Sequence, residues 1–177
     1  LEAMIMADHL LVIENGRVVQ EGSPAQVASQ PATQYVARLV GLNLYGGTLD
    51  PTNRQVLLDG GGTFTVTWGA EDHAVGSAAA GQSALRVLVG LRPSAITIHT
   101  AQPEQASPRN VWPGTVAALE LLTDRVRVQV DATPPALVDI SAAAVADLVL
   151  RPGTAVWLSA KANETEAYYD PRAHHWP

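Results

Sequence analysis

The sequence has no cysteine among its 177 residues, which excludes disulfide bonds, zinc sites built on thiolates and a catalytic thiol. It has a single lysine, Lys161, and its 11 Lys and Arg residues are outnumbered by 17 Asp and Glu residues, which gives a formal net charge of -6. Such a chain offers no basic surface to neutralise a phosphate backbone, so we expect no nucleic-acid partner. It also lacks any apolar run near the roughly 20 residues of a membrane-spanning helix.

The composition is otherwise that of a folded chain. Hydrophobic residues make up 47% of the sequence and charged residues 16%, which is enough to bury the core of one ordinary domain or of two small ones. The absence of cysteine fits a reducing compartment. Because the chain begins with Leu1 rather than with methionine, we expect it to be a piece of a longer protein.

The first part of the chain, residues 1–42, predicts a helix followed by a hairpin and two short helices. Apolar residues at helical spacing come first, and a strand over 10–13 follows. Asn-Gly at 15–16 is the pair favoured by a two-residue type I′ turn, because that turn needs positive φ angles at both positions. The returning strand is then expected over 17–20.

Helix signals follow the hairpin directly. Ser23 and Pro24 are the N-cap and first-turn proline of a predicted helix that runs through Ser29. Pro31 is expected to open a second helix, and Gly41 to end it. The first 42 residues therefore predict a small α/β segment.

From Asn43 onward helix signals nearly vanish, and short β-rich stretches recur between turn residues. We predict a first set of strands over 55–58, 63–68, 85–89 and 96–99, and a second set over 115–122, 125–130, 136–140 and 155–160 with a helix over 142–148. The second set has the order strand, strand, strand, helix, strand, which suits a five-stranded oligomer-binding-type barrel. The glycines at 60–62 lack the lysine and helix of a phosphate loop, so we predict a hairpin loop there, and residues 69–83 are expected to be a flexible connection.

No constellation of residues predicts an active site or a metal centre. His9, His73 and His99 are scattered singly without metal-ligand spacing. No set of Ser, His and Asp pairs a nucleophile with a base. Trp112 and Trp157 are expected in the core or at an interface, since large aromatic residues anchor small barrels.

The first 24 residues, LEAMIMADHLLVIENGRVVQEGSP, resemble the end of the nucleotide-binding domain of ABC importer ATPases. In that family this segment follows the His-Asp of the switch loop. The resemblance implies that the switch histidine, the Walker A and Walker B motifs and the signature sequence all precede Leu1. We therefore expect no enzymatic activity from this chain and no cofactor in it, with ATP and Mg²⁺ bound only by the full-length parent.

Further stretches resemble the TOBE region that follows this ATPase domain, namely VGLN at 40–43 and GLRP at 90–93. A more specific likeness is SPRNVWPGTV at 107–116, which is similar to the SARNxxxGxV opening of molbindin-type domains that bind molybdate and tungstate. Lys161 with the alanine after it resembles the VxKA segment that closes the same unit. The chain departs from the family at Pro108, where the family has alanine.

The resemblance implies an oxyanion site formed by Ser107, Arg109, Asn110 and Lys161. A tetrahedral dianion has only acceptor oxygens, so a hydroxyl, a guanidinium, an amide and an ammonium group suit it, together with backbone N–H groups around Asn110. The residues alone also fit plainer roles. Ser107 then opens an ordinary turn, Asn110 starts a strand, and Lys161 is a solvated surface lysine.

We therefore predict a mainly β fold of oligomer-binding-type (TOBE) β-barrel units preceded by a short α/β remnant of an ABC ATPase domain. The predicted parts are the remnant at 1–42, a first β-rich regulatory subdomain at 43–106, a molbindin-like TOBE unit at 107–169 and a loose tail at 170–177.

The function implied by the resemblance is that of the regulatory and dimerising domain of a molybdate or tungstate ABC importer, binding cytoplasmic oxyanion to modulate transport. The expected partners are a second copy of the chain and, through the parent ATPase domain, the membrane permease subunits. The expected location is the cytoplasmic face of the cell membrane. The alternative is a ligand-free TOBE scaffold in an importer of sulfate, sugar or polyamine; free-standing oxyanion storage is disfavoured by the ATPase-like start of the chain.

Overall fold

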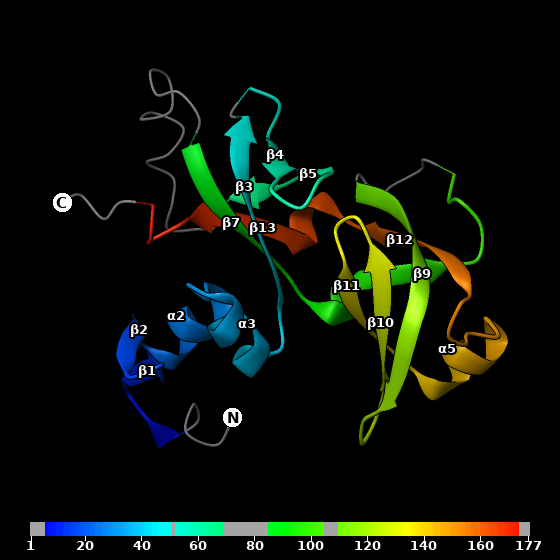
Figure 1. Cartoon of the computed structure of the whole chain (residues 1–177), viewed down its shortest axis with the longest axis horizontal. Helices are drawn as coiled ribbons and strands as arrows, with labels where there is room; N and C mark the ends of the chain where they lie inside the picture. The colour runs from blue at the N-terminus through cyan, green and yellow to red at the C-terminus, as the bar shows by residue number, and fades with distance from the viewer. Residues whose placement is uncertain (1–5, 51, 69–84, 105–109, 174–177) are drawn as a thin grey trace.

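The computed structural model describes residues 6–50, 52–68, 85–104 and 110–173. Over these residues the chain is mainly β, as predicted, and forms a two-stranded hairpin, a five-stranded sheet and a six-stranded sheet. Figure 1 shows the hairpin and two short helices (blue) on one side of the molecule, beneath the six-stranded sheet, with the five-stranded sheet at the opposite end. No helix among these residues is long and apolar enough to cross a membrane.

The N-terminal hairpin confirms the turn chemistry read from the sequence. Strand β1 (Leu10–Glu14) pairs antiparallel with β2 (Arg17–Gly22). Asn15 and Gly16 both have positive φ, at 51° and 76°, which is what a type I′ turn requires and what Asn-Gly supplies at low cost. The helix expected at the very start of the chain falls on residues 1–5, outside the described residues.

The two short helices have the caps that their sequences provide. Helix α2 (Pro24–Ser29) begins with the predicted cap, since Ser23 accepts from the backbone N–H of Gln26 and the Gln26 side chain accepts from the backbone N–H of Ser23. Helix α3 (Gln34–Val40) starts later than predicted, because Thr33 rather than Pro31 is its N-cap. It ends as predicted, at Gly41 in the left-handed conformation.

The rest of the chain repeats one plan twice. The first repeat contains β3 (Asn43–Asp50), β4 (Gln55–Leu58), β5 (Thr63–Thr65), β6 (Thr67–Trp68), β7 (Leu85–Leu91), the 3-10 helix η2 (Pro93–Ala95) and β8 (Ile96–His99). The second contains β9 (Asn110–Leu121), β10 (Val126–Ala132), β11 (Ala136–Ile140), α5 (Ala142–Asp147), β12 (Ala155–Ala160), the 3-10 helix η3 (Ala162–Glu164) and β13 (Thr165–Tyr169).

The strand orders of the two large sheets show that the repeats exchange their last strands. One sheet has the order β5-β4-β3-β7-β13-β6, and the other has the order β11-β10-β9-β12-β8. Thus β3, β4, β5 and β7 match β9, β10, β11 and β12, while β13 pairs with β7 and β8 pairs with β12. Each repeat therefore completes the sheet of the other (Figure 1).

One hydrophobic cluster joins the two sheets. It contains Tyr45, Phe64 and Val89 from the six-stranded sheet with Trp112 and Leu158 from the five-stranded sheet. The Phe64 ring lies 5.6 Å from that of Tyr45, edge to face, and 5.0 Å from that of Trp112, which are distances typical of stabilising aromatic pairs. The expectation that Trp112 is a core residue is thereby confirmed.

The N-terminal helices pack on the outer face of the β7–β13 ribbon. Ala37 of α3 is buried in a small cluster with Leu44, Leu88 and Tyr168. The Tyr168 hydroxyl donates to the carbonyl of Pro31 at 2.9 Å. Burial raises the pKa of Tyr168, so the hydroxyl stays protonated and remains a donor at neutral pH. This contact joins the segment between α2 and α3 to β13.

Gly114 lies at a position of close packing within the five-stranded sheet. A Cβ atom added there would lie 2.6 Å from Cγ1 of Val130 and 2.9 Å from Cβ of Ala132. We expect Gly114→Ala to lower the free energy of unfolding by about 1–3 kcal/mol, because overpacking forces side chains and backbone to shift. Urea unfolding followed by circular dichroism measures this loss. Gly60→Ala is the matched control, since a Cβ at Gly60 meets nothing within 4 Å; equal losses in both variants would contradict the packing argument.

Candidate functional site

The four residues implied as an oxyanion site are only partly within the described structure. Ser107 and Arg109 lie outside the described residues. Asn110 and Lys161 lie at the same end of two neighbouring strands, because Asn110 opens β9 opposite Ala160, the last residue of β12, and Lys161 follows Ala160 directly. The structure thus brings these two together at one end of the β9–β12 pair.

The Asn110 side chain is buried, with only 2% of the residue exposed. Its Oδ1 accepts from the backbone N–H of Thr65 at 2.7 Å, and its Nδ2 donates to the carbonyl of Thr65 at 2.8 Å and to the hydroxyl of Thr165 at 3.1 Å. Both amide hydrogens are therefore donated within the chain. The side chain holds β5 against β9 and leaves no amide donor for a ligand.

A chain of hydrogen bonds connects Asn110 to Lys161. The buried hydroxyl of Thr165 accepts from Asn110 and donates to the carbonyl of Lys161 at 2.9 Å. The same carbonyl accepts from the backbone N–H of Glu164 at 3.0 Å and so starts η3. The backbone of Lys161 is fixed by these bonds, while its side chain stays exposed.

The Lys161 side chain borders an open pocket of about 480 Å³ between the two repeats, which we call the Lys161 pocket. Its described lining is Arg54, Thr65, Val66, Thr67, Lys161, Ala162 and Asn163. These residues supply two cations, two hydroxyls and an amide, although the Thr67 hydroxyl already donates to the carbonyl of Thr165 at 3.4 Å. The described lining contains no carboxylate. Such a set suits a small anion with acceptor oxygens.

Arg54 is positioned by its backbone. It has a positive φ of 53° in the turn between β3 and β4, and its carbonyl accepts from the backbone N–H of Val66 at 3.0 Å. The bond ties this turn to the segment that carries Thr65 and Thr67. The sequence did not identify Arg54, Thr65 or Thr67 as part of the site. The alternation of threonine with apolar residues along 63–67 is a signal that could have indicated Thr65 and Thr67, and no such signal marks Arg54.

A second pocket, of about 520 Å³, lies on the other side of Lys161. It is lined by Arg92, Ser94, Thr97, His99, Ser159 and Glu164 among others. Glu164 pairs with Arg92 at 3.5 Å, and His99 Nε2 lies 2.8 Å from the Ser159 hydroxyl. The carboxylate makes this pocket less suited to a dianion than the Lys161 pocket. The described residues contain no group of three or more His, Cys, Asp or Glu able to hold a metal ion.

Comparison with known proteins agrees with the resemblance read from the sequence. The TOBE domain model matches residues 106–166. The molybdenum import ATP-binding protein ModC of Mycobacterium tuberculosis is 29% identical over 180 residues, covering 98% of this chain and 45% of ModC. The sn-glycerol-3-phosphate import ATP-binding protein UgpC of Yersinia enterocolitica is 32% identical over 125 residues, covering 69% of this chain and 32% of UgpC. The chain thus spans less than half the length of these relatives.

A solved structure shows the same fold. The cytoplasmic molybdate-binding protein ModG, in a form with molybdate bound, superposes with a TM-score of 0.60 at 20% identity, covering 72% of this chain and 95% of ModG. At this identity the likeness establishes the fold alone. Residues 106–166 thus match the TOBE domain model, and the chain is similar along nearly its whole length to the molybdenum import ATP-binding protein ModC.

Proposed function

We propose that this chain is the regulatory part of the ATP-binding subunit of a molybdate or tungstate importer, and that it binds the oxyanion in the Lys161 pocket. The observation that carries the proposal is the pairing of Arg54 and Lys161 around a pocket whose described lining has hydroxyls and an amide but no carboxylate. The names of ModC and ModG support molybdate as the ligand. Ser107 and Arg109, which precede Asn110 in the chain, complete the proposed site.

The pocket lies between the repeats, so a bound anion contacts both. Arg54, Thr65 and Thr67 belong to the first repeat, and Lys161 and Asn163 to the second. Binding regulates transport only through the difference in anion affinity between two arrangements of the subunit. In the proposed mechanism the anion favours an arrangement that holds the ATPase domains of two subunits apart, so high internal molybdate slows import.

The other parts of the proposal follow from the same relationship. Two copies of the chain pair through their regulatory regions, and the parent ATPase domain contacts the permease subunits at the cytoplasmic face of the membrane. ATP and Mg²⁺ bind in the parent ATPase domain, and this chain contributes binding and regulation rather than hydrolysis.

A ligand-free scaffold is the second candidate function. It is favoured by the Asn110 amide, whose donors are all used inside the chain. It also fits the likeness to UgpC and to the spermidine/putrescine import ATP-binding protein PotA of Oleidesulfovibrio alaskensis, which is 36% identical over 102 residues, covering 55% of this chain and 25% of PotA. On this proposal the chain only keeps two ATPase subunits paired.

Calorimetric titration with molybdate separates the two candidates, with sulfate and phosphate at equal ionic strength as controls. We expect saturable binding of molybdate, and we expect Lys161→Ala to weaken it by about 10–100-fold, because a hydrogen bond to a charged group contributes roughly 1.5–3 kcal/mol. Arg92→Ala is the matched control. Arg92 holds the corresponding place before η2, is 70% exposed and does not line the Lys161 pocket.

Molybdate binding that is weakened by Lys161→Ala but not by Arg92→Ala supports the oxyanion-binding regulatory function. If molybdate does not bind to a folded, dimeric sample, the result favours the ligand-free scaffold. Equal weakening by both variants would contradict the Lys161 pocket as the site, because Arg92 lies outside it.

A further inference from the structure

A groove of about 830 Å³ lies between α3, strand β3 and the turn that joins β10 to β11. It shares no described lining residue with the two pockets beside Lys161, and it is larger than either of them. We call it the α3 groove. Its lining is mostly apolar, with Leu44, Leu58, Leu88 and Pro135 among the residues that form it. This volume and this lining are typical of sites for small organic molecules, which occupy roughly 300–1,000 Å³.

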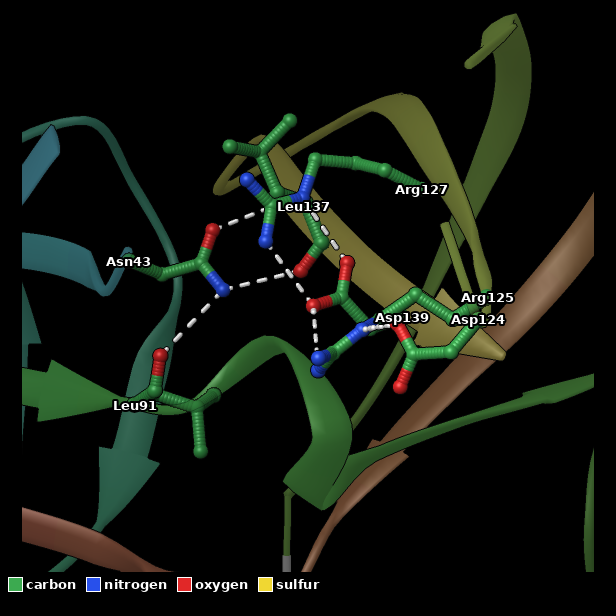
Figure 2. A network of polar contacts seen from close by, with 7 residues as sticks. All are labelled: Asn43, Leu91, Asp124, Arg125, Arg127, Leu137 and Asp139. Atoms are coloured by element: carbon green, nitrogen blue, oxygen red, sulfur yellow. Dashed lines mark hydrogen bonds and ion pairs between the residues drawn. The ribbon is translucent and has the colours of Figure 1, made fainter. Parts of the chain in front are cut away.

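One wall of the α3 groove is fixed by hydrogen bonds between the repeats. Asn43 at the start of β3 accepts from the backbone N–H of Leu137 at 2.8 Å, and it donates to the carbonyls of Leu137 at 2.9 Å and Leu91 at 3.2 Å. Figure 2 shows Asn43 between these two residues. The Tyr45 hydroxyl donates to the carbonyl of Pro135 at 2.9 Å, and burial raises the pKa of Tyr45, so it remains a donor at neutral pH. The β10–β11 side of the groove is therefore held against β3 before any ligand binds.

The opposite wall is the face of α3 that carries Gln34 and Arg38. These residues are four apart, so they lie on the same side of the helix. Gln34 Nε2 donates to the carbonyl of Leu44 at 2.6 Å and fixes this face against β3. Arg38 lines the groove from the last turn of α3, and its guanidinium makes no hydrogen bond or ion pair with any residue that the structure describes. Its N–H donors are therefore available to a ligand.

The other charged side chains of the described lining are already paired. Arg86 donates to both oxygens of Asp59 at 2.6 Å, and these bonds lower the pKa of Asp59, so its carboxylate stays ionised at neutral pH. Arg172 donates to Asp170 at 3.1 and 3.3 Å. The described lining thus has three arginines and the single carboxylate of Asp59. In a chain with a formal net charge of -6, the α3 groove is locally positive, and Arg38 supplies its unpaired charge.

We infer that the α3 groove binds a small organic anion with an apolar body. The acidic group pairs with the Arg38 guanidinium, whose planar fork matches two oxygens of a carboxylate, sulfonate or phosphate group. The apolar body covers Leu44, Leu88 and Pro135 and releases the water that contacts them. Such a ligand bridges the N-terminal segment and both repeats. An inorganic oxyanion has no apolar part to fill the groove, so this site is distinct from the one proposed at Lys161 and does not depend on it.

The plainer interpretation is that Arg38 is a solvated surface arginine, since the residue is exposed. In that case, removing its charge changes the binding of an organic anion no more than removing the charge of any other exposed arginine. A site for an organic anion in the α3 groove depends on Arg38 in particular.

The test is a fluorescence titration of the full 177-residue chain with anilinonaphthalene sulfonate, an aromatic anion whose emission rises when it enters an apolar site. We expect saturable binding, and we expect Arg38→Gln to weaken it by about tenfold, because the variant loses a charge-assisted pair with the sulfonate. Arg151→Gln is the matched control. Arg151 is also exposed, its side chain has no partner among the described residues, and it does not line the groove.

Two further measurements identify the place of binding and the chemistry of the ligand. Gly60 lines the groove, and a Cβ there meets nothing within 4 Å, so Gly60→Phe should fill the groove and abolish binding while circular dichroism confirms the fold. N-phenylnaphthylamine has the same rings without the sulfonate. It should bind more weakly than the sulfonate to the native chain, and equally to the native chain and to Arg38→Gln.

Three results would overturn the inference for the probe itself: no saturable binding, equal affinity for the native chain and Arg38→Gln, or equal weakening by Arg38→Gln and Arg151→Gln. Undiminished binding to a folded Gly60→Phe variant would also overturn it, because the probe would then lie elsewhere. Binding that is lost as the chain dimerises at higher concentration, followed by light scattering, would show that a second copy rather than a small molecule covers the groove.

Discussion

Replacing Asn110 with alanine is expected to lower the free energy of unfolding by about 3 kcal/mol or more, because each buried group left without a partner costs about 1–3 kcal/mol. The change removes three hydrogen bonds at once. It leaves the N–H and carbonyl of Thr65 without the Asn110 amide, and the Thr165 hydroxyl keeps only the bond that it donates to the carbonyl of Lys161. Urea unfolding monitored by tryptophan fluorescence measures the loss.

The chain contains its own control for this experiment. Asn43→Ala removes an equivalent buried amide from the other repeat, where only 7% of the residue is exposed. Both variants should lose similar stability. Only Asn110→Ala should also weaken molybdate binding, because Asn110 positions Thr65 at the Lys161 pocket. Equal weakening by both variants would mean that binding responds to general loosening of the fold.

Trp112→Ala is expected to cost about 3–5 kcal/mol, the range for truncating a large buried aromatic residue. Only 5% of Trp112 is exposed, and its ring packs against Phe64 of the opposite sheet. Its Nε1–H donates to the carbonyl of Pro134 at 3.0 Å, and this carbonyl would lose its partner. The variant should unfold at much lower urea concentration, which circular dichroism at 218 nm is suited to detect.

Two further variants separate packing from hydrogen bonding at this position. Trp112→Phe keeps most of the ring but not the donor, so it should lose less stability than alanine. Trp157→Ala serves as control, since Trp157 is half-buried on β12. A loss for Trp112→Ala no greater than that for Trp157→Ala would show that the contact between Trp112 and Phe64 does not hold the two sheets together.

Much of the local structure could be predicted because it depends on local chemistry. The Asn-Gly turn, the Ser23 cap and the Gly41 stop all follow from backbone conformation and capping. Strands β8, β11 and β12 have the predicted bounds because their apolar residues alternate strictly or end at turn residues. The hairpin loop expected at glycines 60–62 is also present, between β4 and β5.

Two strands escaped prediction because tertiary pairing decides them. Strand β3 (Asn43–Asp50) contains Gly46 and Gly47, which have low β-propensity, yet it pairs with both β4 and β7. Strand β13 (Thr165–Tyr169) is polar at its start and pairs with a strand about 80 residues earlier in the chain. Strand β9 also begins five residues before its predicted start and includes Pro113. Proline is tolerated at this position because the pairing of β9 with β10 does not extend beyond Gly114.

In the candidate site, too, some residues could be predicted from a local sequence motif and others depend on tertiary contacts. Lys161 and Asn110 were named from the sequence motif, and the structure places them together. Arg54, Thr65 and Thr67 come from a turn and two strands of the other repeat, and tertiary contacts between the repeats, such as that of Asn110 with Thr65, bring them beside Lys161. The predicted loose tail begins with a buried Asp170, whose carboxylate accepts from Arg172, while His174 and His175 lie outside the described residues.

The exchanged strands limit how binding in the Lys161 pocket is transmitted. Separating the repeats would require breaking the β8–β12 and β7–β13 ladders together. We therefore expect the two sheets to move as one rigid body and not to open at a hinge between the repeats. The two sheets contact the N-terminal segment where the Tyr168 hydroxyl of β13 donates to the carbonyl of Pro31, close to α3. Strand β13 also starts at Thr165, which bonds to both Asn110 and Lys161. A single five-residue strand thus connects the Lys161 pocket at one end with the N-terminal helices at the other.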